Sequence, residues 1–244
     1  MPLALALGAA AAAPGPARAL NEETRIWPVS GMPLVVGPSP FPQVWVDASA
    51  TFDFAPLELT LSDGRTWRRR PEEPRLDFTA GATIGPFTAA AVLGYEVVGA
   101  AAQVDLRRGD QGRLGITGTA RLGFGGGFDL SLAPAYSALV ASGRRGALAA
   151  FAAARVRWGQ TRYFVQGWDA DHASPYADVV TRDLAVAPMA GLAALWRFAE
   201  LRLTAGWEVF AVNRVDREDR PASLSRSGGP FVVLALRGRM GGAQ

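Results

Sequence analysis

The residues best suited to catalysis lie around the single histidine of the sequence, His172. Asp171 precedes it and Ser174 follows two positions later, so an acid, a base and a hydroxyl are close together in the chain. A serine hydrolase uses these groups, with histidine accepting the proton of the attacking serine. Closeness in sequence does not supply the required geometry, and a solvated loop containing Pro175 is the simpler interpretation. We assign no catalytic residue, keep Asp171, His172 and Ser174 as candidates, and favour a protein without enzymatic activity.

No other motif indicates a cofactor or a metal. The glycine cluster at 123–127 precedes no helical pattern and lacks a phosphate-binding lysine, so we interpret it as a turn and not as a nucleotide loop. The charged run at 216–220 could hold a divalent cation between lipopolysaccharide phosphates, but we favour the simpler interpretation of a solvated loop. The absence of cysteine excludes disulfides, thiolate metal sites and cysteine nucleophiles.

Composition argues against helices and for strands. Hydrophobic residues make up 49% of the 244 residues, yet no run of about 18 apolar residues is free of charged and turn residues, which argues against a spanning helix. The 28 glycines and 17 prolines interrupt any helical pattern at short intervals. The basic residues are all arginines and are dispersed, so the net charge of +3 does not indicate nucleic-acid binding.

Apolar and polar residues alternate with a period of two along most of the chain. In residues 44–54, valine, alanine and phenylalanine take every second position, whereas Trp45, Asp47 and Asp53 lie on the other face. A soluble β-sandwich also alternates, but its strands average about five or six residues, and these runs are longer. The predicted fold is therefore all-β, a transmembrane antiparallel up-and-down β-barrel of about twelve strands. That number includes residues 57–61 and divides residues 148–168 at Gly159-Gln160.

Charged residues recur on one face of the predicted strands, where a barrel lumen would accept them as ion pairs. We interpret them as structural in preference to a substrate channel. The residues predicted to point inward are Arg121, Arg155, Arg157, Arg197, Arg202, Arg237 and Arg239, with Asp77, Asp105, Asp129 and Glu208.

Connection lengths and aromatic residues orient the predicted barrel. We predict tight turns at 125–127, 159–160 and 199–200, and longer loops around 141–147, 169–183 and 211–229. Outer-membrane barrels have short turns on the periplasmic side, so both termini are expected there. Candidates for the aromatic girdles at the membrane interfaces are Trp158, Tyr163, Trp168, Trp196, Phe198 and Phe231.

The first residues resemble a secretory signal peptide. A core of leucine and alanine precedes Ala17-Arg18-Ala19, which fits the small-x-small pattern of a cleavage site. A disordered tail of alanine and proline is the alternative. We predict a signal peptide at 1–19, an N-terminal periplasmic segment at 20–43 and the barrel at 44–240. The expected location is the bacterial outer membrane, with its lipid and lipopolysaccharide as partners.

The order of features from about Pro74 to the end resembles the MipA/OmpV family, named for the MltA-interacting protein. The resemblance is carried by Tyr163-Phe164-Val165, Ser174-Pro175-Tyr176, Arg182-Asp183-Leu184, residues 191–198, residues 201–207 and Arg226-Ser227-Gly228-Gly229. It implies a non-enzymatic outer-membrane scaffold that links a murein hydrolase with a peptidoglycan synthase, and it identifies no site residues. Two alternatives remain open: a passive pore and a lipid A-modifying hydrolase, to one family of which residues 80–95 are similar.

Overall fold

The structure is a computed structural model that describes residues 25–26, 43–54, 57–61, 66–69, 74–94, 97–108, 112–124, 126–166, 176–217, 222–226 and 228–240. The regular elements within these ranges are β-strands. Among the same residues, none forms a helix long and apolar enough to cross a membrane.

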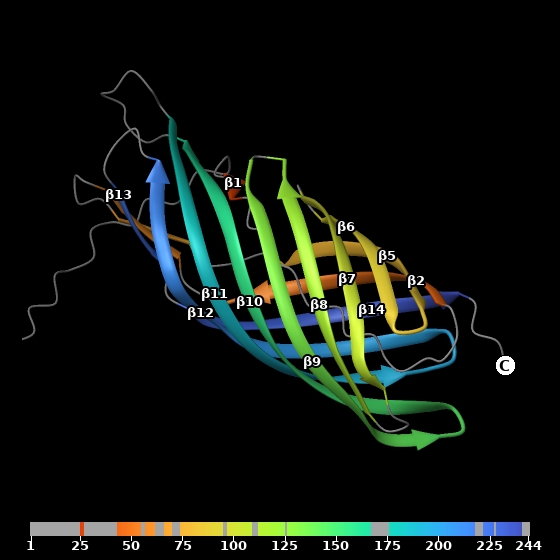
Figure 1. The fold of residues 1–244 in the computed structure, drawn as a ribbon. Coiled ribbons are helices and arrows are strands. Elements are labelled where there is room, and N and C mark those ends of the chain that lie inside the picture. Colours follow the sequence, from red (N-terminus) through yellow and green to blue (C-terminus); the bar gives the residue numbers. More distant parts are fainter. Residues whose placement is uncertain are drawn as a thin grey trace, which may run out of the picture.

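The main sheet closes on itself as an antiparallel barrel (Figure 1). Each strand of the ring pairs with the next one along the chain, and the last pairs with the first, with Met240 opposite Val44 and Phe231 opposite Asp53. The ring has ten strands: β2 (Gln43–Asp53), β5 (Arg75–Ile84), β6 (Phe87–Gly94), β7 (Val97–Arg108), β8 (Gly112–Gly123), β9 (Phe128–Gly143), β10 (Gly146–Gln166), β11 (Tyr176–Leu195), β12 (Ala199–Arg217) and β14 (Gly229–Met240).

The two ends of the barrel differ. We call the end where β2 begins and β14 finishes the terminal end, and the opposite one the distal end. At the distal end β10, β11 and β12 reach beyond their neighbours, since they are 21, 20 and 19 residues long. A separate sheet of β13 (Ala222–Arg226), β3 (Leu57–Leu61) and β4 (Thr66–Arg69) lies at this end, and β1 (Arg25–Ile26) pairs with β10 (Figure 1).

The predicted number of about twelve strands is wrong by two. Residues 57–61 do form a strand, but it pairs with β4 and β13 and not with the barrel. Strand β10 continues through Gly159-Gln160, which pair with Asp183 and Arg182 of β11. A Cβ at position 159 would lie 2.8 Å from the carbonyl oxygen of Phe128, so this glycine permits a close approach of β9 and does not form a turn.

Two other predicted connections differ from the structure, one in length and one in position. The chain turns at Arg144-Arg145, directly between β9 and β10, where a longer loop was predicted. It also turns at Arg197-Phe198, closed by the amide of Trp196 donating to the Ala199 carbonyl at 2.8 Å, so residues 199–200 already belong to β12. The predicted turn at 125–127 is confirmed by Gly126, which has a φ of 92°, but it lies at the distal end. Connection lengths predict this turn on the same side of the barrel as residues 199–200. That side is wrong because the prediction divides β10 into two strands.

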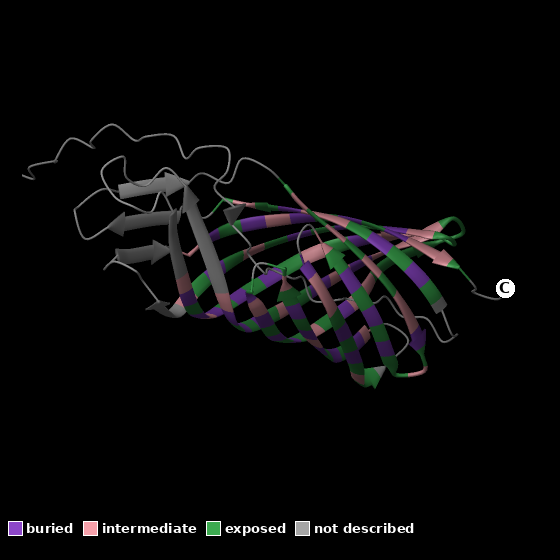
Figure 2. Ribbon diagram, turned by 90° about the horizontal axis from the view of Figure 1, so that it is seen from above, coloured by how far each residue is buried: buried purple, intermediate pink, exposed green. Residues whose placement is uncertain are grey.

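The alternation divides the barrel into an apolar outside and a polar inside. Figure 2 shows buried and exposed residues alternating along the strands. Outward side chains such as Val46, Phe78, Leu122, Leu132 and Leu236 are exposed, whereas Asp47, Thr117, Arg121 and Arg237 are buried. A soluble sandwich would bury its apolar row, and soluble monomers rarely expose so large a contiguous apolar surface. This outer surface suits contact with lipid hydrocarbon.

Candidate functional site

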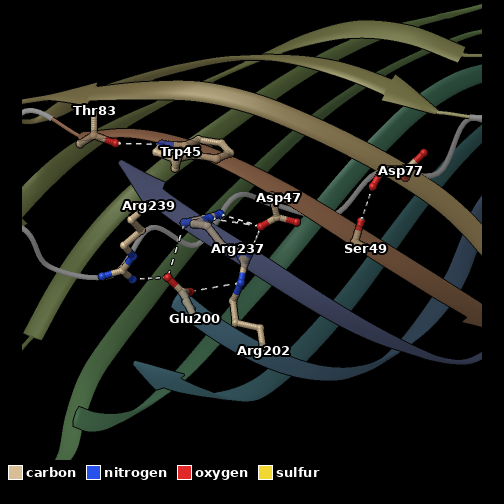
Figure 3. A network of polar contacts seen from close by, with 9 residues as sticks. All are labelled: Trp45, Asp47, Ser49, Asp77, Thr83, Glu200, Arg202, Arg237 and Arg239. Atoms are coloured by element: carbon tan, nitrogen blue, oxygen red, sulfur yellow. Dashed lines mark hydrogen bonds and ion pairs between the residues drawn. The ribbon is translucent and has the colours of Figure 1, made fainter. Parts of the chain in front are cut away.

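The interior at the terminal end holds a network of five charged residues, which we call the terminal network (Figure 3). Asp47 of β2, Glu200 and Arg202 of β12, and Arg237 and Arg239 of β14 meet because these three strands are neighbours in the ring. The registers place Arg237 opposite both Asp47 and Glu200. Its guanidinium lies 3.2 Å from Asp47 Oδ2 and 3.8 Å from Glu200 Oε2.

The remaining contacts make the terminal network continuous. Arg202 pairs with Asp47 and with Glu200, the latter at 3.2 Å between Nε and Oε1. Arg239 adds an ion pair with Glu200. Each carboxylate therefore contacts more than one arginine, and the network joins the first strand of the ring to the last two.

Trp45 anchors the terminal network to the wall beside it. The guanidinium carbon of Arg237 lies 4.3 Å from the centre of a Trp45 ring, a favourable arrangement of a cation over an aromatic face. The indole Nε1 donates a hydrogen bond to Thr83 at 3.4 Å (Figure 3). A Cβ at Gly81 would lie 2.6 Å from Trp45 Cζ2, so the absence of a side chain at Gly81 lets the indole lie close to β5.

A second group of charges, the distal network, comprises Asp129 of β9, Arg155 and Arg157 of β10, Asp183 of β11 and Glu208 of β12. Arg155 Nη2 and Arg157 Nε both lie 3.2 Å from Glu208 Oε1. Arg157 also lies 3.6 Å from Asp129 and 3.9 Å from Asp183. Arg157 is thus the cation shared by all three carboxylates of this network.

A further ion pair crosses the inner face of two strands. Arg121 of β8 lies 3.5 Å from Asp77 of β5, with β6 and β7 between them. Gly99 of β7 is the cross-strand partner of Arg121, and Gly94 of β6 is the partner of Asp77. A Cβ at Gly99 would lie 2.9 Å from Arg121 Cγ, so the two glycines leave the space through which the pair forms.

The walls of the barrel approach one another closely at mid-height. Thr119 of β8 and Val233 of β14 come from opposite sides of the ring, as do Ala101 of β7 and Arg202 of β12. All four line the same cavity, whose volume is about 30 Å³. Trp45 packs against Ala90, Val92 and Ala101, while Phe231 packs against Ala187, Met189 and Val233. At this height the interior is a packed core containing charged residues.

The predicted inward charges agree with the structure, except for one. Arg121, Arg155, Arg157, Arg202, Arg237 and Arg239 lie inside with Asp77, Asp105, Asp129 and Glu208, and Asp105 pairs with Arg113. The placement of Arg197 is wrong: it is exposed in the turn after β11, with its guanidinium 5.0 Å from the Phe198 ring centre. Sequence reasoning omitted Arg113, Asp183 and Glu200 from the list, and it placed Asp47 on the polar face without assigning a partner.

Three of the predicted girdle residues are exposed, as a girdle requires. Trp158 is exposed on β10 and meets Phe128 edge-on with 4.9 Å between ring centres, and Trp196 and Phe198 are exposed at the connection between β11 and β12. Phe231 is buried inside the barrel, which contradicts its predicted place in a girdle. The Tyr163 side chain and Trp168 lie outside the described residues.

The catalytic candidates Asp171, His172 and Ser174 also lie outside the described residues, as do positions 218–220 of the charged run. In the part of the chain that the structure describes, no three His, Asp or Glu side chains are grouped so that they could hold a metal ion. The polar chemistry of the described interior is therefore that of arginine–carboxylate ion pairs.

The closed ring, the apolar outer face and the charged interior define a transmembrane β-barrel of the class found in bacterial outer membranes. No protein-family model matches the chain, and no curated protein matches it. Solved structures with a distant likeness include Neisserial surface protein A, with 9% identity, 81% of this chain and 97% of that chain covered, and a TM-score of 0.34. An outer membrane channel from Pseudomonas putida F1 has 9% identity, coverage of 84% and 100%, and a TM-score of 0.36. A bacterial polysaccharide outer membrane secretin has 9% identity, coverage of 83% and 99%, and a TM-score of 0.30.

Proposed function

We propose that this chain is a bacterial outer-membrane barrel with a sealed lumen, and that it acts as a non-enzymatic scaffold. The observation that carries the proposal is the packing at mid-height, where Trp45 and Phe231 lie in two buried clusters and strands from opposite sides of the ring line a cavity of about 30 Å³. A space of this size accommodates about one water molecule. Barrels that conduct solutes freely have about 16 to 18 strands, whereas narrow barrels are filled by their own side chains.

The ion pairs support a structural interior. Asp47 and Glu200 each contact arginines on neighbouring strands, and both carboxylates are buried. Removing one partner of a buried ion pair costs about 3–5 kcal/mol, because the other charge is then left without compensation. These paired side chains project into the lumen from three neighbouring strands and reduce its open cross-section, which favours a closed barrel over a conducting one.

The location and orientation follow from the same features. The apolar outer face suits the hydrocarbon core of a membrane, and the short turns at Gly85-Pro86, Arg144-Arg145 and Arg197-Phe198 lie at the terminal end. Short turns face the periplasm in outer-membrane barrels. In this orientation the start of β2 and the finish of β14 lie on the side of the cell wall. The murein hydrolase and peptidoglycan synthase implied by the MipA/OmpV resemblance would be bound on that side.

Single-channel recording in planar lipid bilayers tests the sealed lumen. We expect no unitary conductance from wild-type protein whose insertion is verified by heat-modifiable migration on gels. The Trp45→Ala variant, which removes a side chain that is 1% exposed inside the barrel, is expected to admit ions. Leu203→Ala is the matched control, because Leu203 is exposed on the outer face and should leave the barrel silent. Regular openings of the wild-type protein would contradict the sealed lumen.

The scaffold role has its own test. Chemical crosslinking in intact cells, followed by purification of the barrel and mass spectrometry, should recover a murein hydrolase or a peptidoglycan synthase. If crosslinks form with lipid and neighbouring barrels but with no murein enzyme, the scaffold role is wrong, even if the lumen is sealed.

A further inference from the structure

Exposed arginines collect at the terminal end of the barrel. Arg107 lies near the end of β7, Arg144 and Arg145 form the turn between β9 and β10, and Arg197 lies in the turn between β11 and β12. These connections follow one another around the ring, because β7 to β12 are consecutive in it. We call these four residues the arginine crescent.

The arginine crescent is not balanced by exposed acids in the described part of this end. The carboxylates there belong to Asp47, Asp105 and Glu200, whose side chains are only 5%, 1% and 1% exposed. Each of them already pairs with an interior arginine. The exposed surface of the crescent is therefore positively charged and available to an anionic partner.

Neighbouring aromatic residues place the crescent at the edge of the apolar outer face. Ala147, just after the Arg144-Arg145 turn, pairs with Leu195, and a Cβ at Gly146 would lie 3.3 Å from Trp196 Cδ1. The Arg197 guanidinium lies 5.0 Å from the centre of the Phe198 ring. Trp196 and Phe198 are exposed, and such residues lie at the headgroup level of membranes. The arginines are thus at the depth of lipid phosphates.

We propose that the arginine crescent binds the phosphate groups of anionic membrane lipids and so fixes the depth of the barrel in the bilayer. A guanidinium offers paired N–H donors that match two phosphate oxygens, and it remains charged at any physiological pH. The proposal rests on the transmembrane part of the proposed function and is independent of the sealed lumen and of the scaffold role.

The distal end provides an internal comparison. Arg182 of β11 is exposed there, on the strand that also carries Leu195 and leads to the crescent. An Arg182→Gln variant removes one positive charge from the other end of the same barrel. It is the control for the position of the charge, whereas the fourfold variant replaces all the crescent arginines by glutamine.

Native mass spectrometry of the full-length protein, purified in a neutral detergent and titrated with phosphatidylglycerol, measures the predicted binding. A basic residue near an anionic lipid surface contributes about fivefold to affinity, so the variant with R107Q, R144Q, R145Q and R197Q should bind at least about tenfold more weakly. Arg182→Gln should bind like wild type. Diacylglycerol, which lacks the phosphate, should bind equally to all three proteins.

Heat-modifiable migration shows whether the fourfold variant is folded. We expect it to fold, because all four substitutions are at exposed sites at strand ends or in turns.

Equal binding of phosphatidylglycerol by the wild type and the fourfold variant would overturn the proposal. A stronger association of wild type with soluble murein fragments than with phosphatidylglycerol, lost in the fourfold variant, would also overturn it and assign the crescent to the cell wall. Conductance and crosslinking to murein enzymes are separate measurements, so failure here is distinguishable from failure of the proposed function.

Discussion

The two charged networks of the interior are built differently. The terminal network contains three arginines and two carboxylates, and its ion pairs form a continuous chain across β12, β14 and β2. The distal network contains two arginines and three carboxylates, and all three carboxylates contact Arg157. In the terminal network each carboxylate contacts several arginines, whereas in the distal network one arginine contacts every carboxylate. We therefore expect the terminal network to tolerate the loss of one residue better than the distal network tolerates the loss of Arg157.

The loss of Arg157 is expected to have the largest effect. Arg157→Leu removes the cation shared by Asp129, Asp183 and Glu208, so the free energy of unfolding should fall by about 3–5 kcal/mol. Urea unfolding in lipid vesicles, followed by tryptophan fluorescence, measures this change. A decrease smaller than that of Asp47→Asn would show that the distal network does not depend on one residue.

Replacing Asp47 should be less damaging although it contacts two arginines. In Asp47→Asn, Arg202 and Arg237 keep Glu200 as a partner, so we expect a loss of about 2 kcal/mol from weakened charged hydrogen bonds. The same vesicle assay applies. If Asp47→Asn prevents folding altogether, the pairs across β14 and β2 are indispensable and the shared arrangement gives no tolerance.

A loss of similar size is expected where a glycine leaves room for an ion pair. Gly99→Ala places a methyl group 2.5 Å from the Ala120 carbonyl oxygen and 2.9 Å from Arg121 Cγ, so the backbone of β8 must shift and the contact between Arg121 and Asp77 should loosen. Urea unfolding in vesicles measures the loss. Overpacking of this kind costs about 1–3 kcal/mol. Gly85→Ala is an instructive control, because that position has open space but a φ of 56°, so only backbone strain is introduced.

Arg197 should give the smallest effect. Its side chain is exposed and contacts the Phe198 ring, so Arg197→Gln should change the free energy of unfolding by less than about 1 kcal/mol. A loss comparable to that of Asp47→Asn would place Arg197 inside the barrel, as the sequence had suggested.

The alternation of residue types predicted the class of fold and most of the interior. It failed where both faces of a strand are apolar, because the pattern then has no direction: on β14 the inward Phe231 and Val233 alternate with the equally apolar Val232 and Leu234. Phe231 was therefore assigned to the wrong side.

Glycine and strand partners set the other limits. Gly159 suggested a turn, but in the structure it makes room for β9, and this distinction requires knowledge of the neighbouring strand. Residues 57–61 alternate as a barrel strand would, although they pair in the small sheet. The ion pairs depend on the register between strands that are far apart in sequence, such as the pairing of Asp47 with Arg237. That register cannot be predicted from the alternation of residues in a single sequence.

The closure between β2 and β14 is the feature on which the barrel, its sealed interior and its apolar outside all depend. The chain has no cysteine, so an Ala50→Cys and Leu234→Cys pair would be free of competing thiols. These residues are cross-strand partners, and the Cβ atoms of such partners are about 4.5–5.5 Å apart. Mild oxidation of the membrane-inserted protein should form the disulfide in high yield, while Ala50→Cys with Leu130→Cys, on opposite sides of the ring, should remain reduced. Absence of the first crosslink, or equal formation of both, would contradict a barrel closed at this seam.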